Sequence, residues 1–374
     1  MPIAALAEPA CLPAPVKGRA AAQLAIEAAK ARSFGKVFVA AVLESVARVL
    51  PQAPLLAHAI ETWPGDLASA GVIFRLGAGL HAMARSGRHP GLAAIYRDAR
   101  ADAADAAPEP LLLDITLSLA LHDGEADLLQ WMSGPTQTNE VARVAALAAV
   151  LMELDARAPM RTSLLELGSS AGLNLNLEHY DIHMGAQRAG DCSSEVCIAP
   201  RWSGHAPLPG RTRIAGARGV DLNPLDVRRE ADGERLHAYI WPGERARSER
   251  LRAALVLARF HPPQVDRGRA GEWLGQQLAL PQPQGERRVV FHSMVAQYLP
   301  ETERRMIDLA LAQAGRVATP STPLVRVGLE WNADRTAVEV TLTQWHGQAG
   351  AGRPQVVAQC HPYAEWFDWA GLSG

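Results

Sequence analysis

The stretch LLELGSSAGLNLNLEHY, residues 164–180, decides the fold class of this chain. It opens with a short apolar run that contains Glu166 and has the length of a buried β-strand. Small residues between Gly168 and Gly172 predict a tight turn, and the amphipathic segment after Gly172 predicts a helix. A strand, a small-residue turn and a helix in this order are typical of a nucleotide-binding loop, because the helix start offers free backbone N–H groups to a ligand.

The sequence around this stretch alternates short β-like runs with helical segments. Strands are expected at 164–167, 217–221, 287–293, 323–331, 337–345 and 354–360, and helices after Gly172, at about 244–260 and at 301–315. Residues 180–213 hold two weak β-patterns and are interpreted as an inserted hairpin. The pattern predicts an α/β fold with a Rossmann-like, largely parallel sheet that carries an antiparallel hairpin at one edge.

The length of 374 residues favours two domains. Residues 1–17 are rich in proline and alanine and predict a flexible tail, whereas residues 18–158 are rich in alanine and leucine and predict an all-α domain. Residues 159–374 form the predicted α/β domain. Ligands of such sheets bind at the carboxyl ends of the strands, so we expect the helical domain to serve there as a lid or substrate selector.

The charges are balanced overall but uneven along the chain. A formal net charge of −2 gives no global attraction to nucleic acid or to a membrane surface, so neither is expected as a partner. Between Arg201 and Arg269, however, there are 14 arginines and no lysine against eight acids. This excess is interpreted either as a solvated helix face or as a region that attracts an anionic substrate or partner.

The four cysteines predict neither a disulfide framework nor a metal site. Cys192 and Cys197 are too widely spaced for a CxxC metal motif, no histidine lies between them, and Cys11 and Cys360 are remote in sequence. The N-terminal residues lack the charged start of a signal peptide, and no apolar run reaches the length of a membrane span. We therefore expect a soluble, cytoplasmic protein with free thiols; the sequence leaves the oligomeric state open.

The turn does not match the dinucleotide fingerprint GxGxxG, because Gly168 and Gly172 are separated by three residues. The pattern is similar instead to Glu-x-Gly-x-Gly-x-Gly, the loop of class I S-adenosylmethionine-dependent methyltransferases, with Ser170 in the place of the middle glycine. GVDLNP, residues 219–224, resembles the end of their second strand, where an acid binds the ribose hydroxyls. The resemblance implies S-adenosylmethionine as cofactor and a set of binding residues: Glu166, Gly168, Ser169, Ser170, Gly172, Asn174, Asp221 and Asn223. A plain turn before a helix, and an Asx-turn at Asp221, are the alternatives.

Five stretches extend the resemblance over nearly the whole chain. They are QTNEVARVAAL (137–147), LLELGSSAGLN (164–174), GVDLNPLDV (219–227), FHSMVAQYLP (291–300) and HPYAEWFDW (361–369). Together they resemble an uncharacterised bacterial family, the domain of unknown function DUF2332, which is regarded as methyltransferase-like. The resemblance implies a class I methyltransferase-type fold and the cofactor, but no substrate. One position departs from the family pattern, since Arg269 stands where an aspartate would suit the adenine edge.

Further polar residues are expected near the carboxyl edge of the sheet. His292 is a candidate general base because the pKa of histidine lies near neutrality, and a hydrogen-bonded structural histidine is the alternative. Ser293 is expected to face the adenosine, and Tyr298 and Glu330 are further candidates. The polar run before the predicted helix is expected either to cap that helix or to reach over the cofactor pocket, and comprises Gln137, Thr138, Asn139, Glu140 and Arg143.

The predicted function is methyl transfer from S-adenosylmethionine to a small-molecule oxygen or nitrogen acceptor. After the predicted strand 287–293 the sequence has HSMVAQY rather than an Asp/Asn-Pro-Pro-Tyr motif, which argues against methylation of DNA bases. One alternative is a non-catalytic sensor or scaffold that binds S-adenosylmethionine or S-adenosylhomocysteine. An NAD-dependent oxidoreductase is the other alternative, disfavoured by the spacing of the loop.

Overall fold

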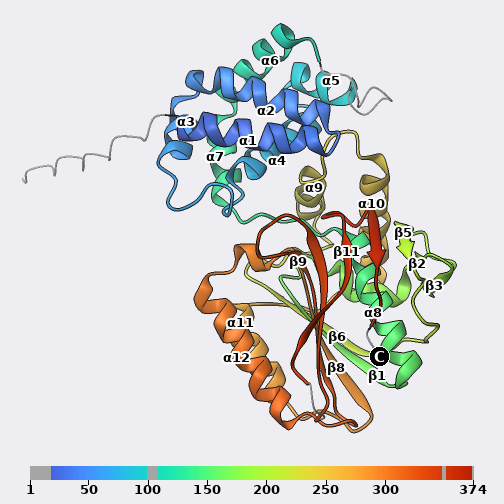
Figure 1. The fold of residues 1–374 in the computed structure, drawn as a ribbon. Coiled ribbons are helices and arrows are strands. Elements are labelled where there is room, and N and C mark those ends of the chain that lie inside the picture. Colours follow the sequence, from blue (N-terminus) through green and yellow to red (C-terminus); the bar gives the residue numbers. More distant parts are fainter. Residues whose placement is uncertain (1–17, 99–107, 348–350, 373–374) are drawn as a thin grey trace, which may run out of the picture. The chain divides into compact units, whose positions relative to one another are not determined.

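The computed structural model describes residues 18–98, 108–347 and 351–372. The chain divides into two compact units, the first made of residues 1–136 with 241–243 and the second of residues 137–240 with 244–374 (Figure 1). The tail expected at residues 1–17 lies outside the described residues. Among the described residues, no single helix has the length and apolarity to span a membrane. The segments Val37–Gln52 and Pro54–Glu61 reach that length and apolarity only when taken together, and the chain bends by 110° between them.

The first unit is helical, as its alanine- and leucine-rich sequence predicts. Three of its helices start at a proline, Pro54, Pro90 and Pro110, because proline lacks only an N–H group that the first turn leaves unpaired anyway. Buried apolar side chains from most of these helices form one core. The elements are α1 (Arg19–Ser33), α2 (Val37–Val49), η1 (Leu50–Gln52), α3 (Pro54–Glu61), α4 (Val72–Ser86), α5 (Pro90–Asp98), α6 (Pro110–Asp123) and α7 (Glu125–Ser133).

The second unit is built on a mixed sheet whose described strands lie in the order β5-β12-β11-β10-β9-β8-β1-β6-β7. The five strands from β9 to β7 are parallel to one another, and β10, β11 and β12 continue from β9 as antiparallel neighbours. The strands are β1 (Arg161–Leu167), β5 (Arg201–Gly204), β6 (Arg213–Asp221), β7 (Val265–Arg267), β8 (Glu286–Ser293), β9 (Leu324–Trp331), β10 (Val338–Trp345), β11 (Pro354–Cys360) and β12 (Trp366–Trp369). The predicted α/β class and largely parallel sheet are confirmed. The expected antiparallel hairpin is formed by β10 and β11, but it does not lie at the edge, because β12 and β5 continue the sheet beyond it. Strands β5, β7 and β12 are not among the strands expected from the sequence.

Helices cover both faces of this sheet (Figure 1). One face packs against α8 (Val144–Arg157) and α10 (Arg245–Phe260), and the other against α11 (Ala270–Ala279) and α12 (Glu301–Val317). Strand β1 shows the alternation, because Leu164 belongs to the first core while Leu165 and Leu167 belong to the second. Glu166 therefore points toward the face that carries α8. A further helix, α9 (Glu230–Ala238), precedes α10.

The segment after Gly172 differs from its prediction. Instead of an α-helix it forms the short 3-10 helix η3 (Leu173–His179), in which Asn176 leaves helical geometry. Tertiary contacts accompany this departure, since the side chains of Asn174 and Asn176 bond to Glu166 of β1 and to the backbone oxygen of His261 rather than to solvent. The chain then leaves the helix at Tyr180 and enters the insertion.

The insertion is larger than the hairpin expected at 180–213. Strands β2 (Asp181–Met184) and β3 (Gln187–Gly190) form that hairpin, and β4 (Cys197–Ile198) adds a third, parallel strand to give a separate sheet in the order β3-β2-β4. The next strand, β5, leaves this small sheet and pairs with β12 at the edge of the main sheet. The insertion thus contributes to two sheets.

Helix α8 lies in the second unit, although residues 18–158 were expected to form one helical domain. Every residue from Val144 to Asp155 is buried. At the end of the helix, Arg287 of β8 bonds to the Asp155 carboxylate at 2.7 Å and to the backbone oxygen of Ala158 at 2.7 Å. Both side chains of this ion pair are at most 3% exposed. The pair therefore fixes α8 to the sheet.

Breaking this pair should destabilise the second unit strongly. In Asp155→Ala the Arg287 guanidinium stays buried without a counter-charge, so we expect the free energy of unfolding to fall by about 3–5 kcal/mol in urea denaturation. Glu301→Ala is the control, because it removes an exposed ion pair with Arg305 and should cost no more than about 1 kcal/mol. Equal losses in the two variants would contradict the role of the buried pair.

Candidate functional site

The carboxyl ends of β6, β1 and β8 lie side by side at one edge of the main sheet. Leu167, the last residue of β1, pairs with Val220 on one side and with His292 on the other. The chain leaves β1 toward β6 and returns across the sheet to β8, so the strand order reverses at β1. This is the position where open α/β sheets bind their ligands. The predicted loop and Asp221 both lie there.

The loop after β1 bends sharply through three residues in left-handed conformation, Gly168, Ser170 and Gly172, with φ of 70°, 55° and 73°. The N–H groups of Gly168 and Ser169 both donate to the backbone oxygen of Val220 in β6. A left-handed conformation is unfavourable for a residue other than glycine, so Ser170 needs a compensating contact. Its N–H group donates to Asp221 Oδ2 at 2.9 Å.

Asp221 ends β6 and points its carboxylate toward the bend. Besides the Ser170 N–H, it accepts the N–H of Asn223 on Oδ1 at 2.8 Å, which closes an Asx-turn. The two interpretations of Asp221 from sequence therefore coexist, since the side chain both forms the turn and faces the loop. Its backbone neighbour Asn223 places its own side chain near Arg267, at 3.3 Å.

The side chain of Gln137 contacts both the loop and the turn that begins at Asp221. Its amide nitrogen lies 3.1 Å from the backbone oxygen of Asn223 and 3.4 Å from Asp221 Oδ1, and its oxygen accepts the Ser170 hydroxyl. Gln137 is 2% exposed. On the other side, Val295 from the segment after β8 packs so closely on Gly168 that a side chain there would clash. Gln137 and Val295 thus cover the loop.

Behind the loop lies a buried pair of acceptors that lack donors. Glu166 and Asn174 are each at most 3% exposed, and the Asn174 amide donates to Glu166 Oε1 at 2.8 Å. In the described structure, Glu166 Oε2 and Asn174 Oδ1 have no hydrogen-bond partner. Burial, with the nearby Asp221 adding to it, raises the pKa of Glu166 to about 8. The carboxyl group is therefore mostly protonated at neutral pH.

The polar run from Gln137 to Arg143 lies inside the second unit rather than on a solvent-exposed cap. Asn139 accepts the N–H of Leu173 from the start of η3, and Arg143 donates to the backbone oxygen of Pro362. The capping side chain is Glu140, which accepts the N–H of Ala142 at the start of the 3-10 helix η2 (Val141–Arg143). The run thus ties together η3, the C-terminal segment and the helix that leads to α8.

Glu140 is also the centre of a buried charge cluster. Its carboxylate bonds to Arg247 at 2.6 Å and to Arg250 at 2.9 Å, and the Arg247 guanidinium lies 4.0 Å from the ring centre of Tyr363. Burial opposes ionisation of Glu140, but the guanidinium groups of Arg247 and Arg250 lower its pKa to about 2. Together with Thr138 and Asn139 these side chains line a hollow against α9 and α10. Two arginines of the basic segment are therefore used internally.

His292 is held from both sides of its ring. Nδ1 lies 2.8 Å from Glu330 Oε1, and the Arg326 Nε–H donates to Nε2 at 3.0 Å. Glu330 also accepts the N–H of Val295, so the three side chains support the segment that covers the loop. The arrangement is that of a structural histidine, and the role of general base stays a prediction that no contact here supports.

The remaining candidates lie beyond β8 and at α11. Ser293 ends β8, and Tyr298 ends the 3-10 helix η4 (Ala296–Tyr298), where it is 38% exposed. Arg269 turns away from the loop and pairs with Glu303 of α12 at 2.7 Å, so it holds two helices together. Sequence reasoning missed Val295, because nothing in an apolar residue after a strand signals that it will cover a glycine.

The raised pKa of Glu166 predicts a pH dependence of stability. The unfolded carboxyl titrates near its ordinary value of 4.5, whereas the folded one stays protonated up to about 8. Stability from this group is therefore complete below pH 4.5 and is lost as the pH rises toward 8, by up to about 1.4 kcal/mol per pH unit. Glu166→Gln should remove this slope in urea titrations between those pH values. The half-exposed Glu178→Gln should leave it intact, and parallel curves for wild type and Glu166→Gln would contradict the assignment.

Comparison with known proteins places the chain in one family. The sequence model described as "Uncharacterized protein conserved in bacteria (DUF2332)" matches residues 21–369, which confirms the resemblance to the DUF2332 family. No curated protein and no solved structure matched the chain. Because the matched residues include both the covered loop and the C-terminal strands, the chain belongs to the DUF2332 family.

Proposed function

We propose that this protein binds S-adenosylmethionine at the loop after β1 and transfers its methyl group to a small-molecule oxygen or nitrogen acceptor. The observation that carries the proposal is the joint position of two acids, Asp221 and Glu166, around one left-handed loop. Asp221, at the end of the neighbouring strand β6, accepts the N–H of Ser170 in the loop. Glu166 Oε2 and Asn174 Oδ1 are buried oxygen atoms without a hydrogen-bond donor in the described structure. On this proposal the sheet is that of a class I methyltransferase-type fold.

The donors of the cofactor suit these acceptors. Ribose hydroxyls are donors for a carboxylate, and Asp221 Oδ1 holds the Gln137 amide only at 3.4 Å, so this contact can yield to a hydroxyl. The ammonium group of the methionine part suits Glu166 Oε2 and Asn174 Oδ1. A bound cation would favour the ionised form of Glu166, so binding should release a proton near neutral pH.

The bound cofactor supplies a methyl group that is already activated on a sulfonium centre. The protein then has to bind, orient and exclude water, and it needs a base only if the acceptor must lose a proton in the step. Gln137 and Val295 cover the loop and are placed to exclude water. The hollow beside Glu140 lies along the same polar segment, but its Arg247 and Arg250 are paired with Glu140 and Glu244, so they supply no excess charge for an anionic acceptor. The selector role expected of the helical domain stays a prediction.

A second candidate is a protein that binds the adenosyl ligand without turnover. It is favoured by His292, whose two ring nitrogens are both engaged. The two functions separate when purified protein is incubated with methyl-labelled S-adenosylmethionine and a small-molecule extract. Label in an acceptor supports the methyltransferase, whereas tight binding with no transferred label supports the sensor or scaffold.

Asp221→Asn tests the cofactor assignment. The variant keeps an acceptor for the loop but loses the charge, and charge-assisted bonds contribute about 1.5–3 kcal/mol each. We therefore expect affinity for S-adenosylmethionine and S-adenosylhomocysteine, measured by calorimetry, to fall at least about 10-fold. The exposed Asp226→Asn in the following loop is the matched control and should bind as wild type does. If wild type binds neither adenosyl ligand, the proposed function is wrong.

Gln137→Ala should separate stability from binding. Removing the amide leaves the Ser170 hydroxyl unpaired and should lower the free energy of unfolding of the ligand-free protein by about 1–3 kcal/mol. The same change removes one of the two donors to Asp221 Oδ1 and leaves only the Asn223 N–H, so the affinity for S-adenosylhomocysteine should rise. Thermal denaturation with and without ligand measures both effects. A parallel fall of stability and affinity would show that Gln137 is itself a ligand of the cofactor rather than its competitor.

A further inference from the structure

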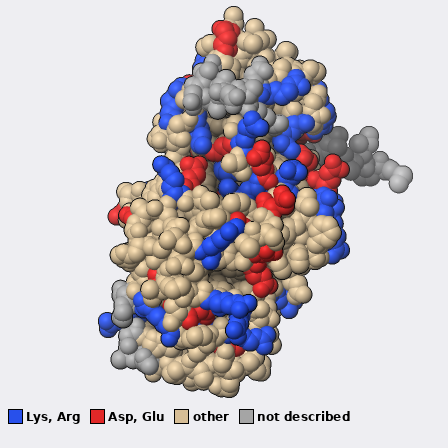
Figure 2. Space-filling model, turned by 90° about the vertical axis from the view of Figure 1, so that its right-hand side faces the viewer, with Lys and Arg blue, Asp and Glu red and all other residues tan. Residues whose placement is uncertain are grey.

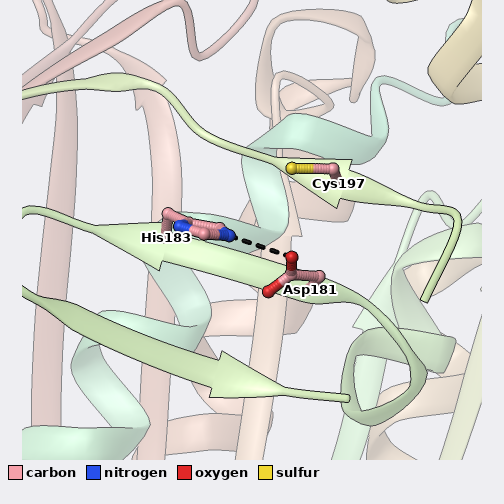
Figure 3. Close-up of side chains that lie close together, drawn as sticks. All are labelled: Asp181, His183 and Cys197. Atoms are coloured by element: carbon pink, nitrogen blue, oxygen red, sulfur yellow. Dashed lines mark hydrogen bonds and ion pairs between the residues drawn. The ribbon is translucent and has the colours of Figure 1, made fainter. Parts of the chain in front are cut away.

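Three side chains with metal-binding atoms converge on one face of the small sheet β3-β2-β4. Asp181 and His183 come from β2, and Cys197 comes from β4 (Figure 3). The register explains the convergence, because Asp181 pairs directly with Cys197, and residues two apart on a strand point to the same side. One carboxylate oxygen, one imidazole nitrogen and the thiol sulfur all lie within 4.8 Å of one another.

These distances suit a small ion bound between the three groups. Zinc bonds of about 2.0–2.3 Å place the ligand atoms of a tetrahedral site about 3.3–3.6 Å apart. His183 Nε2 and Asp181 Oδ2 are 2.9 Å apart. To bind zinc, these two atoms would have to move slightly apart and the Cys197 sulfur slightly toward them. Cysteine, histidine and aspartate together are typical of zinc and atypical of magnesium or calcium, which prefer oxygen ligands alone.

We propose that Asp181, His183 and Cys197 bind a zinc ion, with the fourth position open to water. Asp181 is buried and fixed, whereas His183 is half-exposed and Cys197 exposed, so the ion can enter from solvent. Strand β4 pairs with β2 through only two residue pairs. The ion would therefore act as a cross-link that fastens this short strand to the insertion. This inference does not depend on the proposed function.

Arg188 of β3 is the ion-pair partner of Asp181. Its guanidinium bonds to both oxygens of Asp181, at 2.6 Å for the Nη2 contact, and also donates to the backbone oxygen of Cys192 at 3.1 Å. Its side chain is 47% exposed, so solvent can solvate the guanidinium if a metal ion takes over one oxygen of Asp181. A carboxylate has lone pairs for both a cation and one guanidinium N–H, so Arg188 competes with the ion without excluding it.

Metal analysis of the full chain, prepared without a histidine tag, tests the site. After dialysis against zinc chloride we expect close to one ion per chain, and cobalt(II) should give the thiolate charge-transfer band and the intense visible bands of tetrahedral coordination. Cys197→Ser and His183→Gln should each weaken zinc binding at least about 10-fold, since even outer-shell partners contribute that much. Cys192→Ser is the matched control and should bind zinc as wild type does.

Two results would overturn the proposal. One is absence of stoichiometric zinc or of the cobalt–thiolate band in the wild type. The other is an equal loss of zinc in Cys192→Ser and Cys197→Ser, because the assigned ligand set would then be wrong. Arg188→Gln probes Asp181 without removing a ligand. Loss of the competing guanidinium should tighten zinc binding several-fold, and no gain in affinity would mean that Asp181 is not a ligand.

Discussion

The hydrogen bond from the Ser170 N–H to the Asp221 carboxylate sets the shape of the candidate site. It joins the bend after β1 to the end of β6 and supports a serine in a conformation that costs about 1–3 kcal/mol outside glycine. The Leu225 N–H donates back to the oxygen of the same serine, so the two loops hold each other from both sides. The polar groups around this contact occupy their positions because the two strand ends are tied together there.

Many charged side chains of the second unit form ion pairs with one another. Glu140 and Glu244 together neutralise Arg247 and Arg250. Glu303 neutralises Arg269, and Asp266 pairs with Arg218. On the face drawn in Figure 2, basic and acidic side chains are interspersed. The arginine excess noted in the sequence between Arg201 and Arg269 is thus offset partly by acids that lie outside that segment.

The sequence predicts elements well where the signal is local. The apolar run at 287–293 and the helix at 244–260 correspond to β8 and α10 within one or two residues, and Asp221 is at the strand end and faces the loop as expected. Prediction is poorer where distant contacts decide. Strand β12 forms because β11 and β5 supply its partners, and α8 belongs to the sheet because Arg287 binds Asp155, which no helical pattern reveals.

The metal-ligating cluster shows the same limit. The sequence does not reveal that His183 lies beside Cys197. The two residues match no metal-binding spacing, and no histidine lies between Cys192 and Cys197. The pairing of β2 with β4 brings them together, and that pairing depends on how the insertion folds. Gln137 is a comparable case, since a polar residue before a helix is ordinarily a cap and here contacts both the loop and the turn that begins at Asp221.

The pairing of β5 with β12 has a consequence for how the chain is made. Strand β5 ends at Gly204, and its partner begins only at Trp366, so this edge of the sheet stays open until more than 160 further residues have been synthesised. The indole of Trp369 also donates to the buried Glu153 of α8, which lacks that donor until then. Long-range closure of this kind is slow, and it leaves strand edges available for wrong pairing during synthesis. In a nascent chain that edge therefore stays exposed to wrong pairing until β12 has been synthesised.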